Sequence, residues 1–150
     1  MQRQWRRAAV AAALSITGVL AGLATVAPAQ AETMAALDLQ LAVASDGTAS
    51  AVSGKAMVHG TVTCDQPASV SLTGAVFQVV KKELVRGTFG ALVNCTPGTA
   101  VEWTASATPN GTTPFGKGDA EVSTQATAYY NEYGDSVTVD DTSIVTLSKS

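Results

Sequence analysis

The chain has 150 residues, of which 46% are hydrophobic and 14% charged, and its nine basic and twelve acidic side chains give a formal net charge of −3. This length corresponds to about one domain. The acidic balance argues against binding to nucleic acid or to an anionic lipid through net charge. A metal site would need more ligands than one histidine and two cysteines supply, so we expect no cofactor.

The first residues have the features of an export signal. Three arginines near the start precede an apolar run, and Ala29-Gln30-Ala31 fits the Ala-x-Ala cleavage pattern. Glycine and proline interrupt the run, which is shorter than the ~20 apolar residues of a spanning helix. A retained anchor is the alternative. We predict a cleaved signal peptide over residues 1–31 and a single secreted domain over 32–150, with no membrane span in the mature chain. Loss of the three arginines takes the net charge from −3 to −6.

Alternation of apolar and polar residues dominates the remainder, and helical periodicity is almost absent. Turn signals rich in Gly, Asn and Asp separate the alternating segments, beginning with Ser45-Asp46-Gly47-Thr48. Gly74 is expected to mark a bulge or bend, and Arg86-Gly87 a turn. In chain order, the expected strands cover residues 37–43, 57–64, 70–80, 89–95, 101–107, 120–130, 137–139 and 145–147. This pattern predicts an all-β fold, an antiparallel sandwich of about seven to eight strands.

The two cysteines are predicted to form a disulfide. Cys64 and Cys95 each lie on the apolar parity of their strands, as a bridge between facing strands would require. Two cysteines in an exported chain favour one disulfide. Trp103 lies on the apolar parity of the next strand, and core packing beside the disulfide is favoured over a ligand pocket.

Several residues along the chain also carry a family resemblance. They are Val62-x-Cys64, Gln78, Gly87, Cys95-x-x-Gly98, Trp103 and Phe115-x-x-Gly118-x-Ala120-x-Val122. This pattern, over roughly residues 55–147, resembles small secreted actinobacterial domains with immunoglobulin-like sandwich folds. The resemblance implies the fold and the disulfide, and it carries no catalytic residues. Antibody domains place their tryptophan between the two cysteines, whereas Trp103 follows Cys95.

His59 and the acidic residues near the C-terminus are the candidates for chemistry. His59 is the only histidine, and no Gly-x-Ser-x-Gly motif accompanies it, so a strand-surface position is favoured over a hydrolase base. Calcium could bind carboxylates, but no Asp-x-Asp-x-Asp-Gly loop is present, and solvated turns are the simpler interpretation. The acidic residues considered are Asp119, Glu121, Glu132, Asp135, Asp140 and Asp141. We therefore predict no catalytic residue and no metal site.

Tyrosines near one strand end suggest a contact surface. Tyr129 is expected to point outward and Tyr130 inward, and we predict a contact patch of Tyr129, Tyr133 and Phe115. The sequence favours a non-catalytic binding module that contacts a protein or polysaccharide outside the cell or in its envelope. The alternatives are a carrier of a small apolar ligand, in a cleft lined by residues such as Phe77, Phe89 or Phe115, and a secreted hydrolase.

Overall fold

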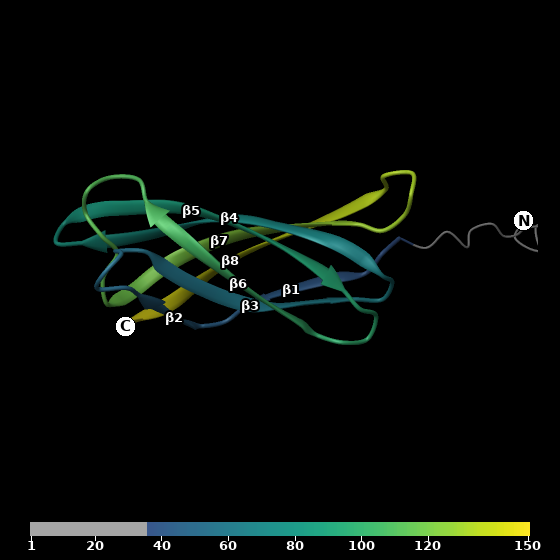
Figure 1. Ribbon diagram of the computed structural model, residues 1–150, viewed down its shortest axis with the longest axis horizontal. Coiled ribbons are helices and arrows are strands. Elements are labelled where there is room, and N and C mark those ends of the chain that lie inside the picture. Colours follow the sequence, from purple (N-terminus) through teal and green to yellow (C-terminus); the bar gives the residue numbers. More distant parts are fainter. Residues whose placement is uncertain (1–35) are drawn as a thin grey trace, which may run out of the picture. The chain divides into compact units, whose positions relative to one another are not determined.

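The computed structural model describes residues 36–150, and the predicted signal peptide lies outside them. Leu37–Ser150 is one compact unit that contains all of the buried core residues described. Its strands are β1 (Leu39–Val43), β2 (Asp46–Ala49), β3 (Ala56–Cys64), β4 (Ala68–Val80), β5 (Glu83–Cys95), β6 (Val101–Pro109), β7 (Gly118–Tyr129) and β8 (Ser136–Lys149) (Figure 1). The all-β prediction is confirmed.

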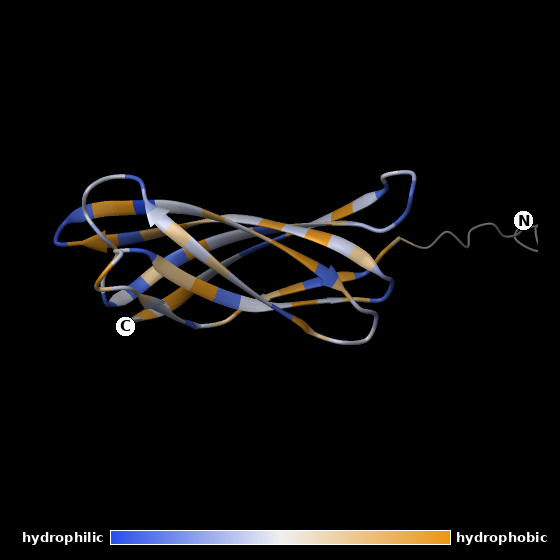
Figure 2. Ribbon diagram, in the orientation of Figure 1, coloured by the Kyte–Doolittle hydropathy of each residue, from blue (hydrophilic) through white to orange (hydrophobic). Residues whose placement is uncertain are grey.

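The strands form where apolar and polar residues alternate, because successive side chains of a strand point to opposite faces. In β6, Trp103, Ala105 and Ala107 are buried, while the residues between them are exposed. Figure 2 shows the same alternation as hydrophobic and hydrophilic bands along the strands. The inward-facing residues of all eight strands contribute to a single hydrophobic core.

The sandwich prediction is wrong, because hydrogen-bonded ladders join what would have been the edges of two sheets. β2 pairs with β3 and also, in parallel, with β8. On the other side, β5 pairs with β6 at Gly87↔Pro109 and Thr88↔Thr108. The strands β3-β6-β5-β4-β7-β8-β2 thereby form a closed ring. β1 pairs with β3 further along that strand than β2 does. The result is a mixed seven-strand barrel rather than an antiparallel immunoglobulin-like sandwich.

The pairing of β4 with β5 contradicts two local predictions. Its register runs without a break from Ala68↔Cys95 to Val80↔Glu83, so Gly74 marks no bulge and Arg86-Gly87 lies within β5. A Cβ atom on Gly74 would lie 2.4 Å from the ring of Phe89, so the glycine makes room for that ring inside the barrel. The turn itself consists of Lys81 and Lys82, which have φ angles of 50° and 70°.

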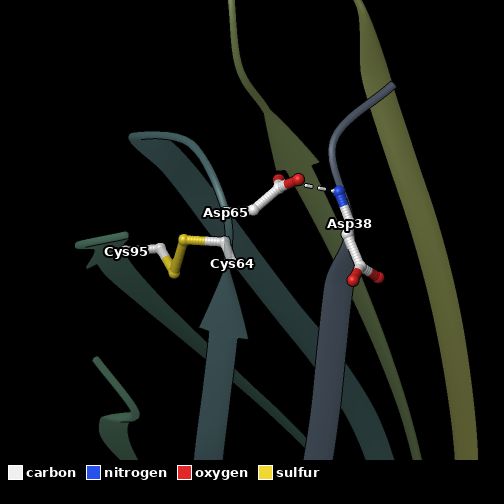
Figure 3. Close-up of a disulfide and its surroundings, with 4 residues drawn as sticks. All are labelled: Asp38, Cys64, Asp65 and Cys95. Atoms are coloured by element: carbon white, nitrogen blue, oxygen red, sulfur yellow. Dashed lines mark hydrogen bonds between the residues drawn. A yellow bond between two sulfur atoms is a disulfide. The ribbon is translucent and has the colours of Figure 1, made fainter. Parts of the chain in front are cut away.

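The predicted disulfide is confirmed. Cys64 at the end of β3 is bonded to Cys95 at the end of β5, with their Cα atoms 6.3 Å apart. Next to it, the Asp65 carboxylate accepts a hydrogen bond from the backbone N–H of Asp38 (Figure 3). Deeper in the barrel, Trp103 stacks on Phe89 with ring centroids 6.2 Å apart. Side chains therefore connect β5 to the β3–β6 pair beyond the short β5–β6 ladder.

The barrel has two ends with different loops. The disulfide end carries the bonded cysteines and the loop 130–135 between β7 and β8. The hairpin end carries the turns at 50–55 and 81–82, the loop 110–117 and the C-terminal residue Ser150. Figure 1 shows these two groups of loops at opposite ends of the strands.

Candidate functional site

The loop 130–135 presents an exposed tyrosine on a turn with internal hydrogen bonds. The side-chain oxygen of Asn131 accepts hydrogen bonds from the backbone N–H groups of Tyr133 (2.9 Å) and Asp135 (3.2 Å). The Asn131 amide group donates to the Asp135 carboxylate at 2.7 Å. Gly134 has a φ of 82°, an angle that residues with a side chain adopt only at an energetic cost. Tyr133 is 83% exposed, so its ring projects from a turn whose backbone is already fixed.

The two neighbouring tyrosines take the predicted orientations. Tyr129, the last residue of β7, is 51% exposed. Tyr130 packs against the core and is partly buried. Tyr129 and Tyr133 thus lie at the disulfide end, on a strand end and on the loop that follows it.

Phe115 does not belong to this patch, and that part of the predicted contact surface is corrected. Its ring is 3% exposed and packs in the core at the hairpin end. The backbone of Gly87 leaves space for it, since a Cβ there would lie 3.1 Å from the ring. The Phe115 N–H donates to the carbonyl of Gly54 at 3.0 Å. Phe115 therefore closes the opposite end of the barrel.

Gln78 holds the loop that carries Phe115, a role that the sequence analysis missed. Its amide donates to the Gly116 carbonyl at 2.8 Å and to the Gly118 carbonyl at 3.4 Å, and its oxygen accepts from the Gly116 N–H at 2.9 Å. Gln78 is 4% exposed. The sequence did contain an indication of this role, because Gln78 falls among the apolar residues that face inward along β4. A buried polar side chain needs partners, and here the loop backbone supplies them.

His59 lies on the outer face of β3, as predicted. Its side chain is 45% exposed, and Nε2 lies 3.3 Å from a carboxylate oxygen of Asp46, which is itself 79% exposed. A shallow depression of about 370 Å³ borders His59, Gly60 and Glu102. Within residues 36–150, no serine or threonine hydroxyl forms a hydrogen bond with His59. The arrangement is an exposed contact between an imidazole and a carboxylate.

The acidic residues considered for calcium are engaged separately. Asp119 accepts from Thr146 Oγ1 at 2.8 Å, and Asp140 accepts from Gln125 at 3.1 Å. Asp141 accepts from the hydroxyl of Ser143. In the described part of the chain, no group of three or more His, Cys, Asp or Glu side chains is arranged to hold a metal ion. Nor does that part contain a helix long and apolar enough to cross a membrane.

Trp103 and the three phenylalanines do not line one cleft. Trp103 and Phe89 are buried together, and Phe115 closes the hairpin end. Phe77 faces outward on β4, with the Arg86 guanidinium 5.4 Å above its ring. One polar atom of this group has no partner, because the buried Nε1 of Trp103 forms no hydrogen bond.

Comparisons with known proteins give a limited result. No protein-family model matches the chain, and neither does any curated protein. Among solved structures, the sporulation control protein Spo0M from Bacillus subtilis is similar, with 13% sequence identity and a TM-score of 0.34. The alignment covers 77% of this chain and 50% of that one, so the chain spans half the length of the Spo0M chain. The fold description therefore rests on the strands of this chain itself.

Proposed function

We propose that this protein is a non-catalytic interaction module that binds a protein or polysaccharide through Tyr129 and Tyr133. The observation that carries the proposal is the exposure of Tyr133, 83%, on a turn that Asn131 fixes by hydrogen bonds. A tyrosine ring offers a large apolar face and a polar hydroxyl group, and a fixed turn loses little conformational entropy on binding. Such side chains are frequent among the residues that dominate binding energy.

The proposal includes where the module acts. The signal peptide predicted over residues 1–31 and the Cys64–Cys95 bridge both suit an oxidising compartment outside the cytoplasm. We infer that the mature chain, starting near Glu32, is extracellular or in the cell envelope. Kinship with small secreted actinobacterial domains remains part of this proposal. It rests on the motif residues Gln78, Gly87 and Phe115, which serve in this chain to anchor the loop 110–117.

The test is capture of partners from envelope extract and culture medium by residues 32–150, which contain every core residue of the described part of the chain. Proteins and glycans retained by the wild type are compared with those retained by Tyr133→Ala and by Leu92→Ala. Leu92 is the matched control, because it is 78% exposed and lies outside the loop 130–135. We expect at least one partner to bind the Leu92→Ala variant as it binds the wild type. The same partner should bind the Tyr133→Ala variant at least ~10-fold more weakly. A partner bound equally by all three proteins would remove Tyr133 from the interaction.

A carrier of a small apolar ligand is the second candidate, favoured by the unpaired Nε1 of Trp103 inside the barrel. A ligand with a hydrogen-bond acceptor could satisfy this donor, whose burial without a partner is otherwise costly. The check is mass spectrometry of small molecules that co-purify with the protein, together with Trp103 fluorescence before and after their extraction. Unchanged emission and an empty extract would dismiss the carrier.

A further inference from the structure

Basic side chains gather at the hairpin end, although they are spread along the chain. Within residues 36–150 there are six, and the ladders place every one of them on the hairpin side of Gly74. They are Lys55, Lys81, Lys82, Arg86, Lys117 and Lys149. Four acidic residues share this half: Asp46, Glu83, Asp119 and Glu121. The remaining seven described acidic residues lie level with Gly74 or on its disulfide side, where no basic residue is found. An acidic protein thus has one basic end.

These basic groups are not neutralised by ion pairs. In the described part of the chain, the ion pair formed is between His59 and Asp46, and none involves a lysine or arginine. Carboxylates at this end accept from hydroxyl groups instead: Glu83 from Thr113 and Asp119 from Thr146. The lysine charges are therefore free to attract an anionic partner.

The β4–β5 hairpin concentrates the charge beside exposed aliphatic residues. Lys81 and Lys82 form the two-residue turn. Val80 and Glu83 flank the turn, and the next cross-strand pair, Val79 and Leu84, is 70% and 68% exposed. In Figure 1 this hairpin projects furthest at its end, and Figure 2 shows a hydrophilic tip followed by hydrophobic segments on both strands. The turn 50–55, elsewhere at the same end of the barrel, carries Val52, which is 96% exposed.

The turn chemistry points to a role other than stability. Both turn residues have positive φ angles, 50° and 70°, which Asn and Gly adopt at much lower cost than lysine. Two lysines in these positions strain the turn and leave its charges unpaired. Strain of this kind concentrates at binding sites, where the exposed groups meet a partner.

We propose that the β4–β5 hairpin docks the protein on an anionic phospholipid surface. Lys81 and Lys82 contact the headgroups, and Val79 and Leu84 enter the boundary between headgroups and acyl chains. Lipid fits better than an anionic polymer, because a polymer of charged groups offers no apolar phase for exposed valine and leucine side chains. Docking in this way leaves Tyr133, at the opposite end of the barrel, directed away from the lipid.

The test is flotation of residues 32–150 with two kinds of vesicle. One contains equal parts of phosphatidylglycerol and phosphatidylcholine, and the other contains phosphatidylcholine alone. We expect binding to the anionic vesicles only, weakened by added potassium chloride. Failure to bind the anionic vesicles, or equal binding to both kinds, would overturn the proposal. Binding to soluble dextran sulfate but not to vesicles would assign the basic end to a polymer and reject the lipid.

Two pairs of variants separate charge from apolar contact. Lys81→Asn/Lys82→Gly removes both charges with residues that favour the turn, and should weaken vesicle binding about 10- to 30-fold. Lys81→Arg/Lys82→Arg keeps the charges and should retain binding. Leu84→Ser should weaken it at least about threefold, whereas Leu92→Ser, an exposed leucine of the same strand nearer the disulfide end, should not. Docking through this hairpin would be contradicted if Lys81→Asn/Lys82→Gly bound vesicles as tightly as the wild type. It would also be contradicted if the substitutions at Leu84 and Leu92 weakened vesicle binding equally.

Discussion

The two ends of the barrel are held together by different kinds of contact. At the hairpin end, backbone ladders complete the ring, since β2 bridges β3 and β8, and β5 meets β6. Towards the disulfide end, the connection from β5 to β3 and β6 relies on side chains, namely the Cys64–Cys95 bond and the stacked rings of Phe89 and Trp103. Charge follows the same division, with the basic residues at the hairpin end.

This difference fits the two proposed contact surfaces, which lie at opposite ends of the barrel. Backbone ladders are largely independent of side-chain identity, so the hairpin end can carry exposed lysines and aliphatic residues while the ring stays closed. Where side chains make the connection, removing them should lower the free energy of unfolding. The following substitutions test whether the ends differ in this way.

The largest effect is expected for Trp103→Ala. Trp103 is 2% exposed, and its removal leaves a cavity beside Phe89. We expect a loss of about 3–5 kcal/mol in the free energy of unfolding, measured by urea denaturation. Tyr133→Ala is the exposed aromatic control and should change stability by less than about 0.5 kcal/mol. A small effect at Trp103 would mean that the stacked rings do not hold the strands together.

Removal of the disulfide comes next. Cys64→Ala/Cys95→Ala releases a cross-link between residues 31 apart in sequence, and should cost about 3–4 kcal/mol by the loop-entropy estimate. Thermal unfolding of the variant and of the reduced wild type should agree. If the variant unfolds at the wild-type temperature, the backbone ladders alone are enough to hold the barrel.

The matching test at the hairpin end is Gln78→Leu. The substitution keeps the side chain's approximate size but leaves the N–H of Gly116 and the carbonyls of Gly116 and Gly118 without their partner. We expect a loss of about 1–3 kcal/mol in unfolding free energy. The loop 110–117 should also be cleaved faster by protease than in the wild type. Unchanged cleavage would show that Phe115 and its contact with Gly54 hold the loop without the glutamine.

The smallest effect has the opposite sign. Lys81→Asn/Lys82→Gly relieves the positive-φ strain of the β4–β5 turn, and should stabilise the fold by about 1 kcal/mol. The change is measured by the same denaturation experiment. A destabilised variant would mean that the two lysines contribute to the stability of the fold. Weaker vesicle binding by this variant would then no longer be evidence for contact between the lysines and lipid.

The sequence allowed most of the strands and the interior to be predicted, because alternation is a local property. Two strand predictions were wrong: β2 covers residues expected to form a turn, and β8 is one strand where two short ones were expected. The sequence also placed Cys64 and Cys95 on inward positions, and it assigned Tyr130 inward and Tyr129 outward, all as observed. Barrel closure could not be read in the same way. Asp46–Ala49 is short and resembles a turn, and its parallel pairing with Thr146–Lys149 joins residues about one hundred positions apart.

The candidate site was predicted only in part, for related reasons. Tyr133 is on a turn that local sequence indicates, whereas the burial of Phe115 depends on Gln78 and Gly87, which come from two other strands. The gathering of the basic residues was equally hidden. Net charge is a sum over the chain, and it conceals that the fold brings lysines from the separate turns 50–55, 81–82 and 110–117 to one end.

The most direct measurement is amide hydrogen exchange of residues 32–150 on anionic vesicles compared with the free protein, read peptide by peptide. If the two ends have separate roles, exchange should slow in peptides that cover the β4–β5 turn around Lys81 and Lys82. Peptides from the loop 130–135 should exchange at the same rate with and without vesicles, because Tyr133 faces away from the lipid. Slowed exchange in the loop 130–135, with none at the hairpin, would contradict the assignment of the two ends.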